Sequence, residues 1–122
     1  MVGAKLTEMG IRFDMMLTSA HKRAILSLKN VRETYQFSES TPCAIMTQIH
    51  EEFGVNMGGQ TFPGLTRSQV LELMPELQIS EEQGQILTED GWFRLDHIET
   101  QEELTARVKL CVNMFKDMAK TE

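Results

Sequence analysis

The chain has 122 residues, of which 41% are hydrophobic and 25% are charged, and its formal net charge is −6. This length suits one domain with its own core, and the composition is that of an ordinary globular protein. No stretch approaches the ~18 apolar residues of a membrane-spanning helix, and the first residues lack the apolar core of a signal peptide. We therefore expect an intracellular, cytoplasmic protein that does not enter a membrane.

The charge is unevenly distributed along the chain. Residues 1–38 carry six basic and three acidic side chains, a net charge of +3, whereas residues 39–122 carry six basic and fifteen acidic ones, a net charge of −9. An acidic body disfavours general nucleic-acid binding, which depends on neutralising phosphates. If nucleic acid binds, we expect it on the first 38 residues; a basic protein partner suits the acidic body equally well.

The N-terminal part contains the first predicted helix. Between Ile11 and Leu17 apolar residues alternate as in a strand, although a helix also fits, so we treat residues 1–17 as an extension of uncertain order. From Thr18 the apolar residues recur at helical spacing, which predicts a helix to about Gln36. A single domain is expected over residues 18–122.

The segment after this helix predicts a second one. Thr41 can act as an N-cap, and Pro42 suits the first helical position, where a missing N–H costs nothing. The apolar spacing then predicts a helix over residues 42–53 that ends at Gly54. An irregular loop is expected over residues 55–64.

A third helix is predicted to begin at Thr66 or Ser68 and to stop at Pro75. Residues 77–79 then have an extended pattern.

Residues 84–96 predict a β-hairpin, because Asp90-Gly91 between apolar runs is a strong signal for a tight turn. Neighbouring residues of a strand face opposite sides. We expect Phe93 to point inward and Trp92 to cover the rim of the core, with an aromatic wing tip that stacks a base or fills a partner's pocket as the alternative.

The last element is the clearest helix, over residues 100–119. Thr100 and Glu103 form a predicted capping box. Leu110 and Met114 fall off the main apolar face, and this extra width indicates a second interface. The main face is formed by six residues: Leu104, Val108, Cys111, Val112, Phe115 and Met118.

The order helix, helix, helix, hairpin, helix predicts an α+β, mostly helical fold, namely a winged helix-turn-helix with a β-hairpin wing and an added C-terminal helix. Histidines and cysteines occur singly, without the spacing of a zinc site. Neither Cys43 nor Cys111 stands in a nucleophile motif, and Gly58-Gly59 lacks the residues of a phosphate loop. We expect no metal, no cofactor and no enzymatic activity.

Residues 41–79 resemble the LOTUS domain, also called OST-HTH, a winged-helix module of RNA-related proteins. Phe53-Gly54 resembles the family's helix end and Met57 the apolar residue that follows. Residues 62–65 approximate its turn, although Pro63 stands where the family usually has glycine. Pro75-Glu76-Leu77 resembles the exit from the next helix.

The resemblance implies a non-catalytic adaptor in RNA metabolism. The extended form of the family has a helix after the wing and binds a Vasa-type DEAD-box RNA helicase, so docking through the second and last helices is implied. The protein-binding residues expected on these helices are Gln48, Glu52, Arg107, Leu110, Met114 and Phe115.

Two other classes of function stay open. The first is a nucleic-acid-binding regulator, either a winged helix or a ribbon-helix-helix protein over residues 11–53. The second is a homodimerising scaffold or a protein inhibitor. The residues expected to bind RNA or DNA in the first class are Lys22, Arg23, Lys29, Arg32, Arg67, Trp92 and Arg94.

Overall fold

The structure is a computed structural model that describes residues 2–50, 56–57 and 60–120, and it has an α+β fold. Within these residues the α-helices are Val2–Glu8 (α1), Lys22–Thr34 (α2), Arg67–Leu73 (α3), Glu81–Ile86 (α4) and Gln101–Lys120 (α5). The strands are Met16–Thr18 (β1), Cys43–Ile45 (β2), Asn56–Met57 (β3) and Gln60–Thr61 (β4). Two 3-10 turns cover Ser38–Ser40 (η1) and Thr47–Ile49 (η2).

The central feature is a small parallel sheet. β1 pairs with β2 so that Met16 lies opposite Cys43 and Thr18 opposite Ile45. A further parallel bridge joins Ala44 to Gln78, which places β2 in the middle of the sheet. α2 connects β1 to β2, and α3 lies between β2 and Gln78 in the chain, as parallel pairing requires a crossover connection.

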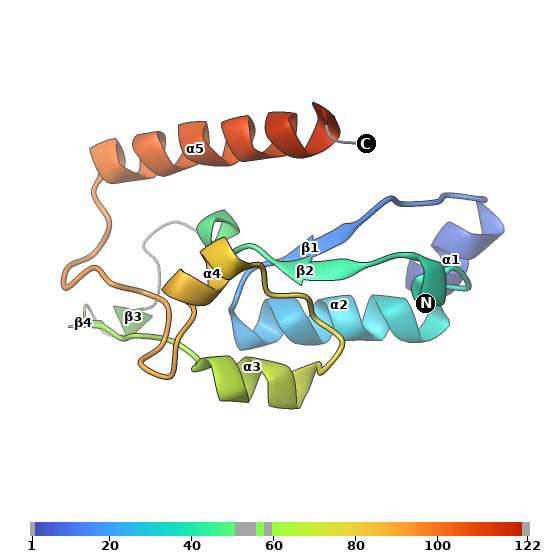
Figure 1. Cartoon of the computed structure of the whole chain (residues 1–122), viewed down its shortest axis with the longest axis horizontal. Helices are drawn as coiled ribbons and strands as arrows, with labels where there is room; N and C mark the ends of the chain where they lie inside the picture. Colours follow the sequence, from blue (N-terminus) through green and yellow to red (C-terminus); the bar gives the residue numbers. More distant parts are fainter. Residues whose placement is uncertain (1, 51–55, 58–59, 121–122) are drawn as a thin grey trace.

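The sheet lies between two layers of helices (Figure 1). α2 and α3 lie below it in that view, and α5 runs across its opposite side. α1 packs on α2, where Gly3 lies so close to the carbonyl of Val31 that a Cβ atom would overlap with it. Residues 2–17 therefore join the fold, because α1 covers α2 and β1 supplies a strand.

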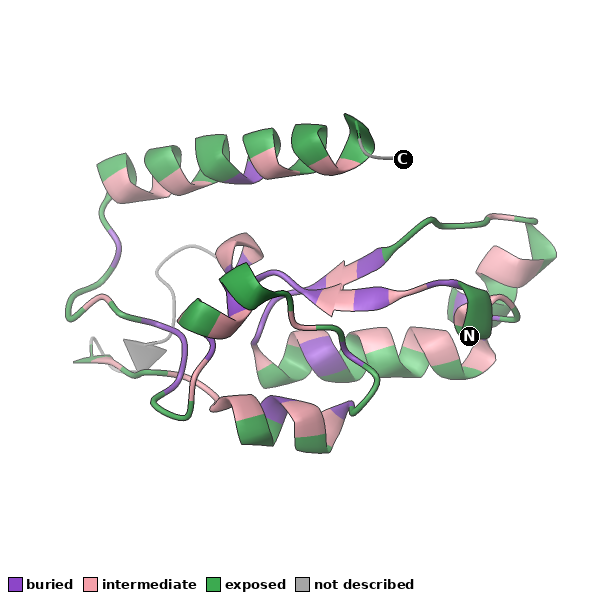
Figure 2. Ribbon diagram, in the orientation of Figure 1, coloured by how far each residue is buried: buried purple, intermediate pink, exposed green. Residues whose placement is uncertain are grey.

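The core lies on the α2 side of the sheet. Ile25 of α2 and Val70 of α3 are fully enclosed, and Met16 packs in the same cluster (Figure 2). Along β1 the environment alternates: Met16 and Thr18 are buried, whereas Leu17 is half-buried and lines a hollow beneath α5. The two faces of the sheet therefore differ, one being a packed core and the other an open surface.

The expected second helix over residues 42–53 is wrong for the residues described. β2 and η2 occupy 43–49, and residues 51–55 lie outside the described residues. Cys43 and Ile45 are buried at a period of two, because both face the core while β2 pairs along both of its edges. Pairing with segments far away in the chain outweighs the local helical spacing.

The expected hairpin over residues 84–96 is wrong in extent. Residues 81–86 form α4, and the only ladder pair described in this segment joins Thr88 to Gly91. Gly91 has a φ of 93°, a left-handed conformation that favours glycine. The tight turn is therefore present at the expected place, but it has no long strands.

Trp92 and Phe93 are both buried, with 4% and 7% of their surface exposed. The Trp92 ring makes an edge contact with His21, the two centroids being 5.2 Å apart, and it lies at the same distance from His50. Phe93 is inward as expected. An aromatic wing tip at the surface is wrong for Trp92, because this ring packs among other rings in the interior.

Three predicted helices are confirmed, two of them with their start signals. α2 lies within the expected segment but begins at Lys22, because Thr18, the expected start, belongs to β1. α5 covers its expected segment, and α3 begins after Thr66, whose side chain accepts a hydrogen bond from the Gln69 N–H. Thr100 and Glu103 form the predicted capping box: the Thr100 N–H donates to Glu103 at 3.0 Å, and the Glu103 N–H donates to Thr100 at 3.2 Å.

Candidate interaction surface

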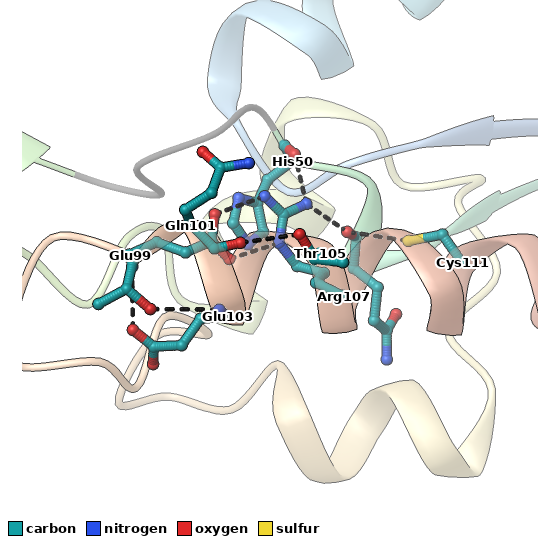
Figure 3. Close-up of polar contacts among 9 residues, drawn as sticks. His50, Glu99, Gln101, Glu103, Thr105, Arg107 and Cys111 are labelled. Atoms are coloured by element: carbon teal, nitrogen blue, oxygen red, sulfur yellow. Dashed lines mark hydrogen bonds and ion pairs between the residues drawn. The ribbon is translucent and has the colours of Figure 1, made fainter.

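α5 is attached to the domain by a buried ion pair near its first half (Figure 3). Arg107 donates to both carboxylate oxygens of Glu99 at 2.7 Å, and the side chains are only 14% and 4% exposed. Arg107 also donates to the carbonyls of Gln48 (2.9 Å) and His50 (2.7 Å). A bidentate, hydrogen-bonded pair of this kind fixes orientation as well as distance. We call Glu99 and Arg107 with these two carbonyls the α5 clamp.

Further contacts tie the α5 clamp to α4. The Cys111 thiol donates to the same Gln48 carbonyl at 3.2 Å. The Gln48 side chain accepts from Gln83 of α4 at 2.8 Å, and the Gln83 amide oxygen accepts from the Thr47 N–H and hydroxyl. One turn, η2, is thus held by two helices, and it fixes where the first half of α5 lies.

The start of α5 carries a second, exposed cluster. His97 lies 2.9 Å from Asp96 and 2.7 Å from Glu103, which also takes part in the capping box. The hydrogen bond to Asp96, and next that to Glu103, raises the pKa of His97 above its ordinary value. The bond to the Thr100 backbone and then His97 lower the pKa of Glu103. Each contact stabilises the charged form of both partners, the imidazolium of His97 and the carboxylates beside it.

The two sides of α5 that flank its inward-facing residues carry exposed apolar side chains. Four large side chains are exposed on this helix (Figure 2): Val108 (50%), Leu110 (49%), Val112 (44%) and Phe115 (44%). The expected main apolar face is therefore wrong for Val108, Val112 and Phe115, which do not pack on the domain. The residues that face inward recur every three or four positions: Leu104, Arg107, Cys111, Met114 and Met118.

A groove separates the second half of α5 from the sheet. It has a volume of about 360 Å³. Its floor includes Leu17 and Ala44, its wall includes Glu82 of α4, and its roof is formed by Met114 and Met118. The second half of α5 therefore overhangs the sheet without filling the space beneath it, unlike the clamped first half.

The two flanks of α5 look toward different neighbours. Leu110 lies on the same side of the helix as Met114, which faces α4 across the groove. Phe115 lies with Ala119, which lines a second hollow with Phe13 and Met15 beside β1. We call the first side the α4 flank and the second side the β1 flank.

The structure divides the residues expected to bind a protein partner. Leu110 is exposed and Met114 lines the groove, both on the α4 flank, whereas Phe115 is exposed on the β1 flank. Gln48 and Arg107 are engaged in contacts within the domain, so they place α5 rather than offer a surface. Glu52 lies outside the described residues.

The residues expected to contact nucleic acid do not converge. Lys22 and Lys29 of α2 line one hollow with Gln69 and Glu72 of α3, and Arg23 is exposed on α2. Arg67, at the start of α3, is half-buried.

Two further arginines of that set have roles within the fold. Arg32 donates to the carbonyls of Thr41 (2.7 Å) and Ser38 (2.8 Å), and Arg94 donates to the carbonyl of Ile86 at 2.8 Å. Trp92 is buried, and of the expected set Lys22 and Lys29 line one hollow together.

Reactive groups are scarce in the described part of the chain. Cys43 and Cys111 are buried free thiols, and burial raises the pKa of each, which keeps them protonated and weakly nucleophilic. Among the described residues no group of three or more histidine, cysteine or acidic side chains is arranged so that it could hold a metal ion. None of the helices described combines the length and apolarity needed to cross a bilayer.

Comparison of the chain with family models, curated proteins and solved structures finds no match.

Sequence reasoning missed the role of Glu99 and the groove residues Leu17 and Met118. From the sequence, Glu99 is one of several acidic residues near the start of a helix, and nothing there indicates a buried ion pair. Its partner Arg107 lies eight residues on and inside the helix, so an i, i+4 search does not find the pair. The alternation along β1 was visible, and it correctly places Leu17 on the opposite side of the strand from Met16.

Proposed function

We propose that this chain is a non-catalytic protein-interaction module whose partner docks in the groove between α5 and α4. The observation that carries the proposal is the contrast within α5: Arg107 fixes its first half, while Leu110 is 49% exposed and Met114 and Met118 roof an apolar groove. Exposed apolar side chains beside a preformed groove are typical of protein-binding sites. Methionines in such a groove adapt to partners of different shape.

Charge indicates the chemistry of the partner. Glu81 and Glu82 are exposed in the first turn of α4, and Glu82 lines the groove. The whole chain carries a net charge of −6. The fitting partner is therefore a segment with apolar side chains for the groove and basic residues beside them, because complementary charge speeds encounter.

We also propose that the fold is a variant of the winged helix. The succession of α3, a short connection, α4 and the tight turn at Thr88–Gly91 supports it, since these elements follow the order of a helix-turn-helix and wing. The parallel bridge between Ala44 and Gln78 departs from the antiparallel wing sheet that we expected.

The resemblance to the LOTUS domain gives the proposal its candidate partner, a DEAD-box RNA helicase, and its setting, a cytoplasmic adaptor in RNA metabolism. The resemblance lacks one element among the described residues, because β2 and η2 stand where it implies a helix. α5 supports it, as the helix that the extended form adds after the wing.

Calorimetric titration of a purified DEAD-box helicase core into the full chain tests both the groove as the docking site and the helicase as the partner. Leu110→Glu should weaken binding at least about tenfold, since a carboxylate would be desolvated in the interface. Val112→Glu places the same charge on the β1 flank of the same helix and should leave the affinity unchanged. Equal affinities for Leu110→Glu and the unmodified chain would reject the groove as the docking site.

If the helicase does not bind, the named partner is rejected while the groove can still be tested. An amphipathic peptide of leucine and lysine then serves as the probe. We expect the methyl NMR signals of Met114 and Met118 to move on titration, with that of Met9, which is exposed far from the groove, as the internal control. Unmoved groove signals would reject the docking proposal itself.

A further inference from the structure

The β1 flank of α5 is a second apolar surface, separate from the groove. Val112, Phe115 and Ala119 recur at spacings of three and four residues and therefore line one side of the helix. Val112 and Phe115 are each 44% exposed. Ala119 lines the hollow beside β1 together with Phe13 and Met15, which are 40% and 38% exposed.

β1 is an edge strand whose outer side is open. The Met16 N–H donates to the Pro42 carbonyl, and the Thr18 carbonyl accepts from the Met46 N–H, so these two residues of β1 make the ladder with β2. Because backbone groups alternate along a strand, the N–H and C=O of Met15 and Leu17 point away from β2.

Nothing in the described part of the chain covers this edge with a hydrogen bond. No backbone hydrogen bond of Met15 is found among the described residues, and a hollow beside β1 is lined by Met15, Leu17 and Met118. This hollow has a volume of about 360 Å³. An unpaired edge next to apolar side chains is a template for another strand.

We infer that a second copy of this chain occupies the β1 edge and the β1 flank of α5 together, giving a two-fold symmetric dimer with a continuous sheet. The two β1 strands pair antiparallel about Met16, so Met15 of one copy lies opposite Leu17 of the other. Each copy then supplies the N–H and C=O groups of both residues to hydrogen bonds between the chains.

The same axis brings the two α5 helices together. Met118 and Ala119 lie over Met15 and Leu17, so the axis passes near the last turns of α5. The helices cross this axis antiparallel, with Phe115 of each copy beside Ala119 of the other.

The spacing agrees with this pairing. The groove places α5 above both β1 and β2, and neighbouring strands lie ~4.8 Å apart. The two helices are therefore about two strand spacings, or ~10 Å, from each other, which is a distance at which helices pack.

A second copy fits this surface better than a foreign peptide does. An added peptide strand satisfies the edge but leaves Phe115 exposed on the helix above it. One symmetry axis covers both features with the same residues, as an isologous interface requires. Met15, Leu17 and Met118 line both the hollow and the partner groove, but the dimer forms through the backbone of β1 and the β1 flank, so its test needs no bound partner.

Charge gives the dimer a distinctive response to salt. Each copy carries a net charge of −6, and Lys116 follows Phe115 near the axis. Like charges therefore oppose association, and added salt should tighten the dimer by screening them. Binding of a basic partner or of nucleic acid should weaken with salt instead.

Sedimentation equilibrium of the full chain tests the inference. We expect a reversible dimer whose dissociation constant falls with added salt. Phe115→Glu should give a monomer. Met15→Pro should weaken the dimer about tenfold or more, because it removes an outward N–H from each copy without touching the ladder with β2.

Leu110→Glu is the matched control, since it adds the same charge at an equally exposed residue on the other flank; it should remain a dimer. Thermal unfolding followed by circular dichroism shows whether each variant is folded. A monomeric unmodified chain or a dimeric Phe115→Glu chain would each overturn the inference.

Discussion

The two halves of α5 are held in different ways. The first half is fixed by directed polar contacts, with Arg107 bound to Glu99 and to two carbonyls of the η2 region. The second half, from Val112 to Lys120, overhangs a groove that its methionines roof without filling. A helix attached in this way has a defined position and still keeps apolar side chains available to partners. The first half of α5 thus fixes the position of the helix, and the second half offers side chains to a partner.

Breaking the α5 clamp should lower the free energy of unfolding more than any other change to α5. Arg107→Ala leaves the carboxylate of Glu99, which is 4% exposed, without its bidentate partner. Removal of one member of a buried pair typically costs about 3–5 kcal/mol, so we expect a loss of that order in the free energy of unfolding. Urea denaturation measures it. Lys109→Ala, at an exposed residue of the same helix, is the control and should change stability little.

Removing the N-terminal cap of α5 should lower the free energy of unfolding by a smaller amount. Thr100→Ala deletes the side-chain acceptor of the Glu103 N–H and should cost about 1 kcal/mol. Thr105→Ala is the matched control. Its hydroxyl donates to the Gln101 carbonyl within the helix, and alanine is the better helix former there, so stability should not fall. Equal losses in the two variants would remove the capping box from the explanation.

The groove side of α5 should tolerate truncation better than the core. Met74→Ala empties a fully enclosed site and should cost about 2–5 kcal/mol. Met118→Ala shortens a half-buried side chain above existing empty space and should cost less than about 1 kcal/mol. Thermal unfolding of the two variants compares them directly. A similar loss in both would mean that the second half of α5 is part of the packed core.

The His97 cluster should give the smallest effect, one that depends on pH. Because Asp96 and Glu103 raise the pKa of His97 above its ordinary 6.5, protonated His97 favours the folded state. This contribution is complete below pH ~6.5 and is lost as the pH rises through the higher pKa of the folded protein. NMR titration of His97 measures it. In Asp96→Asn the pKa should move toward 6.5, and an unchanged pKa would exclude Asp96 as the main cause.

The sequence predicted the elements whose signals are local. α3 and α5 begin where Thr66 and Thr100 satisfy free N–H groups of the first turn, and such caps depend only on residues three positions apart. The residues that determine these features lie within one or two helical turns of each other in the sequence.

The predictions that were wrong share one cause, which is contact between segments that are distant in the sequence. Cys43–Ile45 has helical neighbours in the sequence, but its strand pairs with β1 on one edge and with Gln78 on the other. The expected apolar face of α5 failed for a related reason: the clamp to Gln48 and His50 sets which side of the helix turns inward, and those carbonyls are nearly sixty residues away. No local pattern encodes such contacts.

Residue-level hydrogen exchange along α5 tests the central claim, that this helix is anchored through its first half alone. The experiment uses the full chain at a concentration below the dimer dissociation constant. We expect amides from Thr105 to Cys111 to exchange only with global unfolding, and those from Asn113 to Lys120 to exchange through local opening at a free energy lower by about 2 kcal/mol or more. Uniform protection from Thr105 to Lys120 would contradict the account.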